Sequence, residues 1–160
     1  MMGVGKSTLG KIVAKRQGLK FLDTDSNIEK KYSMTISKIF EKKGEKFFRL
    51  LEEKEVLESL KKSNCVISIG GGAFMSKLVR EKILKNSISI WLDLDIETIN
   101  KRIKWIKKRP LLNEKNKEKK LLELYNERRD VYSLAKYKID CNNITKENII
   151  KKIIYLHEKN

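Results

Sequence analysis

The chain begins with a glycine-rich stretch, MMGVGKST, that ends in a lysine and two hydroxyl residues. A phosphate-binding loop reads G-x-x-x-x-G-K-[ST] between a buried strand and a helix. Its amides surround the phosphates, its lysine contacts the outer ones, and its serine ligates Mg²⁺. The stretch predicts such a loop for a nucleotide, formed by Gly3, Val4, Gly5, Lys6, Ser7 and Thr8. Taken alone, it also fits a helix start capped by a hydroxyl.

Two carboxylates follow in the stretch FLDTD, at Asp23 and Asp25. Strand side chains alternate with period two, so we expect both on the same side of a strand end. Ligands of open α/β sheets bind beyond the carboxyl ends of the strands. Two acids there suit Mg²⁺ and a hydroxyl nucleophile. The alternative is that Asp25 caps a short helix over Asn27 to Tyr32.

A third apolar run, VISIGGG, ends in Gly70, Gly71 and Gly72. Many P-loop enzymes place an aspartate of the metal shell at such a strand end. Three glycines instead offer bare amides and space, so that a flat ring or its hydroxyls can approach the backbone. Asp23 must then take the metal-side role. A tight turn is the alternative.

Three arginines complete the set of candidate functional residues. Arg49 and Glu52 lie three residues apart in EKFFRLLEEKE, where an exposed helical ion pair would contribute only about 0.2 to 0.5 kcal/mol. An arginine oriented by Glu52 would bind a carboxylate with paired, planar hydrogen bonds. Arg128 lies on a late helix, and Arg109 lies in a lysine-rich loop that can close over a γ-phosphate. Arg49 or Arg128 alone is more often a solvated charge, and a plain basic loop is the alternative for Arg109.

The composition indicates one domain over residues 1–160, with 40% hydrophobic residues for its core. The net charge of +16 is spread from Lys11 to Lys159 among glutamates, without a basic arm, which argues against nucleic-acid binding. No apolar run approaches the roughly 18 residues of a membrane span, and we expect a soluble, cytoplasmic protein. Cys65 and Cys141 are expected to be reduced core thiols.

Apolar runs alternate with helical patterns, which is typical of a parallel sheet covered by helices on both faces. The predicted strands are Leu19 to Asp25, Cys65 to Gly70, Ser87 to Leu94 and Tyr137 to Cys141. The predicted helices, besides the short one above, are Lys6 to Gln17, Ser37 to Lys62, Ser76 to Asn86, Ile96 to Ile106, Lys119 to Leu134 and Thr145 to Glu158. Asp95 and Thr145 are the expected N-caps.

Six motifs, G-x-G-K-S-T, F-L-D-T-D, F-R-x-x-E, S-x-G-G-G-A, R-P-L-L and E-R-x-x-x-Y, occur in an order and spacing that resemble the shikimate kinase family, from Gly3 to about Asn142. The resemblance implies an α/β, three-layer P-loop NTPase-like fold, a parallel sheet with helices on both faces. It also implies substrate-binding helices over about residues 26–62 and a mobile lid over about 104–120. The implied enzyme is a monomeric transferase that phosphorylates the 3-hydroxyl of shikimate with ATP and Mg²⁺, in the biosynthesis of chorismate and aromatic amino acids.

The resemblance also assigns roles to residues. It implies that residues 3–8 hold the ATP phosphates, with Ser7 on Mg²⁺ and Asp23 in its outer shell. Lys6, Asp25 and Arg109 are the implied catalytic residues, and Arg102 resembles a nucleotide contact. The implied shikimate contacts are Asp25, Phe48, Arg49, Gly70, Gly71, Gly72 and Arg128.

Two other functions remain as alternatives. A gluconate-kinase-like enzyme is disfavoured by the glycine triplet and the F-R-x-x-E helix. A P-loop module that binds nucleotide without catalysis is disfavoured by Asp25, Arg49, Arg109 and Arg128 together.

The start of the chain raises a separate expectation, because the first loop glycine would fall one residue before Met1 and no strand precedes the loop. In the family that strand is central, in the order 2-3-1-4-5. Its loss would leave the strands Cys65 to Gly70 and Ser87 to Leu94 unpaired on facing edges. We expect a natural chain that begins upstream, the alternative being a short chain that is less stable or inactive.

Overall fold

The structure, a computed structural model, describes residues 3–104 and 117–160. The helices are α1 (Lys6–Arg16), α2 (Thr24–Tyr32), α3 (Ile36–Ser59), α4 (Lys77–Asn86), α5 (Ile96–Lys104), α6 (Lys117–Tyr132) and α7 (Lys146–Glu158). The strands are β1 (Lys20–Asp23), β2 (Cys65–Ser68), β3 (Ile90–Asp93) and β4 (Tyr137–Asp140), and a 3₁₀ turn covers Ala73–Met75. The predicted elements are confirmed, with ends shifted by a few residues, and the predicted helix end at Ile106 lies outside the described residues.

The strands pair in parallel, as predicted. β1 pairs with β2, and its last residue, Asp23, lies opposite Ser68. β3 pairs with β4, with Asp93 opposite Asp140. The first register is important for function, because it brings the carboxyl ends of β1 and β2 level with each other.

A groove of about 820 Å³ separates the two pairs of strands. Within the described residues no backbone ladder joins β2 to β3, so the sheet consists of two two-stranded parts. Residues of both strands line the groove, together with Val4 and Leu9 of the N-terminal segment. The expectation that these two strands leave their facing edges unpaired is therefore confirmed.

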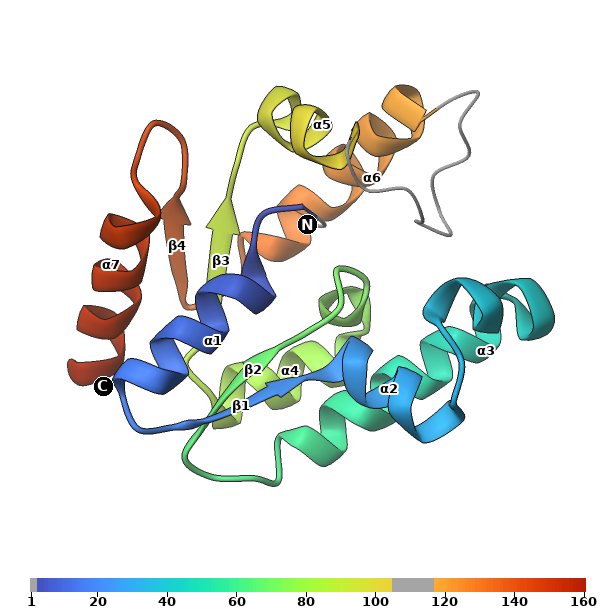
Figure 1. The fold of residues 1–160 in the computed structure, drawn as a ribbon, viewed down its shortest axis with the longest axis horizontal. Helices are drawn as coiled ribbons and strands as arrows, with labels where there is room; N and C mark the ends of the chain where they lie inside the picture. The colour runs from blue at the N-terminus through green and yellow to red at the C-terminus, as the bar shows by residue number, and fades with distance from the viewer. Residues whose placement is uncertain (1–2, 105–116) are drawn as a thin grey trace.

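Helices cover the strands from both sides. α1 packs on β1 and β2 and against α7, whereas α3 contacts α4 and α2. Figure 1 shows α1 and α4 on opposite sides of β1 and β2. The main core gathers buried side chains of α1, α4 and α6 with those of β3 and β4, such as Val13, Val79, Leu121, Leu92 and Ile139.

A second, smaller core holds α2 and α3 together. Its buried members are Ile28, Ile39 and Phe48. The helix α3 is kinked at Gly44, whose φ of 80° and ψ of 168° lie in a region that is essentially restricted to glycine. The predicted substrate-binding helices thus form a unit with its own core, which projects to the right in Figure 1.

The helix starts agree with the predictions at two positions and differ at one. Asp95 Oδ1 accepts a hydrogen bond from the Thr98 amide at 2.6 Å, and Thr145 caps α7. α2, however, begins at Thr24, and its cap is Asp23, whose Oδ1 accepts from the Ser26 amide at 3.1 Å. The alternative in which Asp25 caps this helix is therefore wrong, and Asp25 lies in the first turn of the helix.

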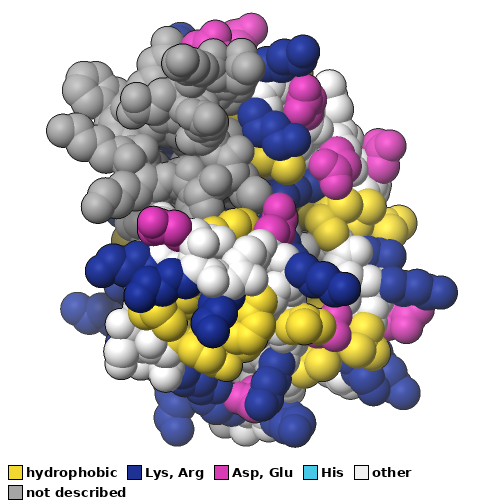
Figure 2. Space-filling model, turned by 90° about the vertical axis from the view of Figure 1, so that its right-hand side faces the viewer, with side chains coloured by type: hydrophobic (Ala, Val, Ile, Leu, Met, Phe, Trp, Pro, Cys, Tyr) yellow, Lys and Arg dark blue, Asp and Glu magenta, His cyan; other side chains and the backbone are white. Residues whose placement is uncertain are grey.

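The charged side chains are spread as expected. On the face shown in Figure 2, lysines and arginines alternate with acidic and apolar side chains and form no continuous stripe. Among the described helices, none combines the length and the apolar character needed to cross a membrane.

The prediction of core thiols is confirmed for Cys141 alone. Cys141 is buried, and burial raises the pKa of its thiol to about 11. Cys65 is also a free thiol but is only partly buried, at the wall of the groove.

Candidate active site

The predicted phosphate loop leads directly into α1. Gly3 and Gly5 have φ values of 76° and 93°, and the buried Val4 between them anchors the loop in the core. No side chain caps the helix at Gly5. The first amides of a helix have no partner within the helix, and the helix dipole makes this end positive. The loop and the first turn of α1 therefore present backbone amide donors and a partial positive charge to an anion.

Three oxygen-bearing side chains meet beside this loop. Ser7 Oγ donates to Asp23 Oδ2 at 2.5 Å and lies 3.4 Å from Ser68 Oγ. Hydroxyl and carboxylate oxygens are the ligands that Mg²⁺ prefers, and this ion usually keeps few protein ligands besides water and phosphate. The donor set therefore fits Mg²⁺, although the described residues hold no cluster of three histidine, cysteine or acidic side chains.

Sequence reasoning missed Ser68. It is the last residue of β2, the strand end at which many P-loop enzymes carry an aspartate, and only the glycines that follow it were predicted as site residues. Its pairing with Asp23 depends on the strand register, which could have been inferred from the two strand ends.

Asp25 lies near the turn after β2, for a different reason than predicted. β1 ends at Asp23, so strand alternation does not place both acids, and the first turn of α2 carries Asp25 instead. A Cβ atom built on Gly70 would lie 2.8 Å from Asp25 Oδ1 and 2.1 Å from Glu52 Oε1. Both carboxylates therefore approach the backbone at Gly70 more closely than any side chain there would permit.

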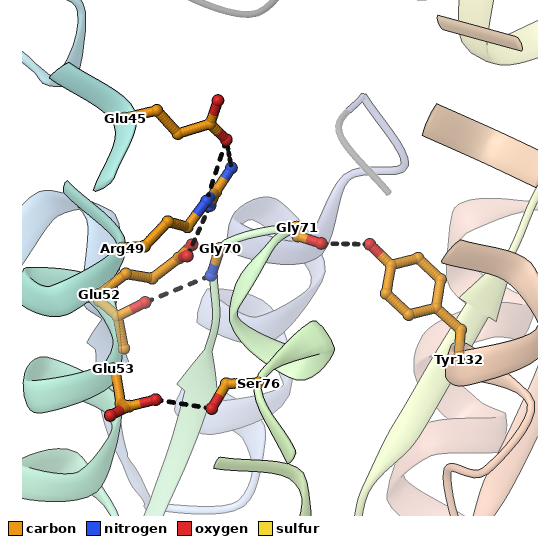
Figure 3. A network of polar contacts seen from close by, with 9 residues as sticks. Glu45, Arg49, Glu52, Glu53, Gly70, Gly71, Ser76 and Tyr132 are labelled. Atoms are coloured by element: carbon orange, nitrogen blue, oxygen red, sulfur yellow. Dashed lines mark hydrogen bonds and ion pairs between the residues drawn. The ribbon is translucent and has the colours of Figure 1, made fainter. Parts of the chain in front are cut away.

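Arg49 is held by two carboxylates of its own helix (Figure 3). Its Nη1 donates to Glu52 Oε2 at 2.6 Å, whereas its Nε and Nη2 donate to Glu45 Oε1 at 3.2 and 2.9 Å. The guanidinium carbon lies 5.4 Å from the ring centre of Phe48. Burial lowers the pKa of Arg49, but the two glutamates outweigh this effect and raise it.

Glu52 is a buried carboxylate, with 2% of its surface exposed. Burial raises its pKa, and the positive charges of Arg49 and Arg128 oppose this shift. Because a buried charge is stable only when it is paired, both arginines contribute to holding Glu52 in place.

Arg128 is itself buried, with 5% of its surface exposed. The alternative in which Arg128 is an ordinary solvated charge is therefore wrong. Its Nε has no hydrogen-bond partner within residues 3–104 and 117–160. A buried charged donor without an acceptor is costly. An anionic ligand in this pocket would supply the missing acceptor.

The glycine run forms a turn that accommodates neighbouring side chains. The Ala73 amide donates to Gly70 O, and the Tyr132 hydroxyl on α6 donates to Gly71 O (Figure 3). A Cβ on Gly72 would lie 2.0 Å from Arg49 Nη1. The tight turn predicted as an alternative is thus present. It must lack Cβ atoms at Gly70 and Gly72, because the side chains of Arg49 and Glu52 contact its backbone closely.

Arg49 and Arg128 line a pocket of about 300 Å³. Glu45, Glu52 and Gly72 also line it, but Asp25 and Phe48 do not. The groove between the strand pairs is larger, yet its walls are mainly apolar and carry no opposed charges of this kind. We therefore assign the acceptor side of the candidate site to the smaller, charged pocket. Lys6 of the phosphate loop lines the groove instead, together with Ser68, Gly70 and Gly71.

The remaining predicted residues lie elsewhere. Phe48 is buried in the small core, where its ring supports Arg49. Arg102 is exposed on α5. Arg109 and residues 105–116 of the predicted lid lie outside the described residues, and the last predicted lid residues, 117–120, belong to α6.

Comparisons with known proteins agree on one family. A family model described as shikimate kinase matches residues 2–157. The shikimate kinase of Sulfurihydrogenibium sp. strain YO3AOP1 is 39% identical over 153 residues, covering 96% of this chain and 91% of that protein. That of Bartonella henselae is 36% identical over 154 residues, covering 96% of this chain and 73% of that protein.

Solved structures give the same result. Shikimate kinase from Acinetobacter baumannii in complex with shikimate superposes with a TM-score of 0.93 at 36% identity, covering 99% of this chain and 89% of that one. Shikimate kinase from Aquifex aeolicus gives a TM-score of 0.85 at 33% identity, covering 99% and 92%.

Removal of the buried carboxylate should destabilise the fold. We expect Glu52→Ala to lower the free energy of unfolding by about 3 to 5 kcal/mol, because it leaves Arg49 and Arg128 without their shared counter-charge. Urea unfolding of both proteins measures the difference. Glu58→Ala on the same helix is the control: it also removes an ion pair, but an exposed one with Lys31, and should cost much less. Equal losses for the two variants would contradict the interpretation of Glu52.

Proposed function

Because the chain belongs to the shikimate kinase family, we propose that it transfers the γ-phosphoryl group of ATP to the 3-hydroxyl of shikimate. The products are shikimate 3-phosphate and ADP. The observation that supports this acceptor most directly is the pocket lined by both Arg49 and Arg128. The buried Nε of Arg128 has no hydrogen-bond partner among the described residues. Such a pair of guanidinium groups suits a carboxylate, the one anionic group of shikimate.

The acceptor's hydroxyl groups would face Asp25 and the glycine turn. Asp25 lies beside Gly70, at the end of β2 nearest the phosphate loop. In the proposed step, the 3-hydroxyl oxygen forms a bond to the γ-phosphorus, and the bond between this phosphorus and the β–γ bridging oxygen breaks. Asp25 accepts the proton of the hydroxyl. The main contributions are positioning and charge stabilisation, as in other phosphoryl transfers.

The nucleotide would bind at the loop of residues 3–8, with its phosphates on the amides at the start of α1 and on Lys6. Ser7 and Asp23 would hold Mg²⁺, and Ser68 lies within reach of the same site. When bound, Mg²⁺ neutralises charge that develops on the phosphoryl oxygens. Arg109 and Arg102 stay as proposed nucleotide-side residues, on the basis of the family motifs alone.

The acceptor can be identified by a direct assay. The 160-residue chain is incubated with MgATP and with shikimate, gluconate or no acceptor, and ADP release is measured. We expect release that depends on shikimate. Release with gluconate alone would change the substrate class, and nucleotide binding without turnover would favour a non-catalytic module.

Replacement of the proposed proton acceptor should separate binding from catalysis. We expect Asp25→Asn to lower kcat by at least about 100-fold, since general bases of this kind contribute about 10² to 10⁴. The dissociation constant of MgATP should change little, because the loop of residues 3–8 is untouched. Normal turnover by this variant would show that Asp25 has no role in the reaction.

The close approach at Gly72 can be tested through the Michaelis constant. In Gly72→Ala the new methyl group overlaps Arg49 Nη1, and the flexible end of this side chain must move aside. We expect KM for shikimate to rise about tenfold with a small change in melting temperature, because one charge-assisted hydrogen bond is lost. Gly18→Ala, at a left-handed turn far from the pocket, should lower stability and leave KM unchanged. A normal KM in Gly72→Ala would remove Arg49 from the binding site.

A further inference from the structure

The guanidinium group of Arg49 is already occupied by carboxylates of the chain. Its Nη1 is bound to Glu52, and the edge formed by Nε and Nη2 is bound to a single oxygen of Glu45 (Figure 3). The edge of Nε and Nη2 offers two parallel N–H groups, which is the geometry that binds a carboxylate with two hydrogen bonds. Glu45 therefore sits where a ligand's carboxylate would bind best.

The two glutamates differ greatly in burial. The side chain of Glu52 is 3% exposed, whereas that of Glu45 is 52% exposed. Glu52 cannot leave its place without stranding buried charge, but Glu45 can turn toward water at little cost. Of the two partners that Arg49 has in the described part of the chain, only Glu45 can be exchanged for a ligand.

The position of Glu45 in the chain supports this assignment. It is the first residue after the kink at Gly44, so it begins the helical segment that carries Arg49 and Glu52. Spacings of four and three residues place all three side chains on one face of that segment. This face opens into the pocket, whose lining includes Glu45 together with Arg128.

We propose that Glu45 is a displaceable internal carboxylate, which occupies Arg49 in the ligand-free site and competes with the carboxylate of the substrate. This inference rests on the proposed function, because it takes the ligand of Arg49 to be the substrate's carboxylate. A simple carboxylate that displaces Glu45 from Arg49 gains little binding free energy, because it only replaces one carboxylate on this group with another. A ligand that also binds Arg128 and presents hydroxyls to the glycine turn gains more, so the competition favours the polyhydroxylated acid.

The test compares KM for shikimate in the wild type, Glu45→Gln and Glu41→Gln. Glu41 is exposed on α3 before the kink, and it is not a partner of Arg49. Its substitution changes the net charge by the same amount, and thus controls for the general electrostatic attraction of an anion. Benzoate, a carboxylate without hydroxyl groups, serves as a competitive inhibitor in all three proteins.

We expect Glu45→Gln to lower KM by about 1.5- to 5-fold with kcat unchanged, the range that corresponds to the loss of an exposed ion pair. The inhibition constant of benzoate should fall at least as much, and Glu41→Gln should change neither constant. An unchanged KM, or the same decrease in Glu41→Gln, would overturn the proposal. A raised KM would also overturn it, because Glu45 would then orient Arg49 for the substrate. Glu45→Ala, which lacks any hydrogen-bonding group, should agree with Glu45→Gln.

Failure of the proposed function would look different. If the wild type releases no ADP with shikimate, equilibrium titration with shikimate and with benzoate replaces the kinetic assay. Tighter binding of benzoate to Glu45→Gln than to Glu41→Gln would then support the competition at Arg49, even though the reaction had been misassigned. Equal binding by the two variants would overturn the competition itself.

Discussion

The carboxylate of Glu52 is the constraint that shapes the proposed acceptor pocket. A protein interior solvates charge poorly, so a buried carboxylate needs cations close by. Arg49 supplies a direct ion pair, and Arg128 acts from α6. The backbone after β2 must then pass very close to these side chains, which is sterically possible only without Cβ atoms at Gly70 and Gly72. The absence of side chains at Gly70 and Gly72 is thus required by the buried charge of Glu52 as well as by the space that a ligand needs.

The two halves of the site belong to structural units with separate cores. The phosphate loop is anchored by Val4 in the main core, whereas Arg49 is carried by the helices of the small core. The turn after β2 lies between them, and the hydroxyl of Tyr132 on α6 holds it at Gly71. In the proposed function, the position of this turn would set the distance between the acceptor's carboxylate and the phosphates. The turn is joined to α6 by a hydrogen bond and approaches the side chains of Arg49 and Glu52 closely.

Local chemistry could be predicted from the sequence, and long-range placement only in part. Arg49 and Glu52 lie one helical turn apart, so spacing alone implied their ion pair. The burial of Arg128 comes from packing between helices that are distant in the chain, and a single segment cannot indicate it. Ser68 reaches the loop through the register of β1 and β2, which no spacing within one segment encodes. Asp25 was placed near the correct turn by an incorrect argument, because a capping side chain ends the strand two residues earlier.

The choice of arginine over lysine follows from the need to serve two anions at once. A guanidinium group has separate edges, so Glu52 can fix one edge while the other is left for exchange. A lysine at this position would carry a compact ammonium group, which would pair with the buried carboxylate of Glu52 and leave no separate edge for a second anion. The ring of Phe48, whose centre lies 5.4 Å from the guanidinium carbon, packs against this group. In the free protein Glu45 occupies Nε and Nη2 of Arg49. The affinity for an anion therefore depends on how much more strongly its carboxylate binds these donors than the carboxylate of Glu45 does. The number of positive charges around the pocket is therefore a poor measure of its affinity, and the additional contacts of a ligand decide which anion binds.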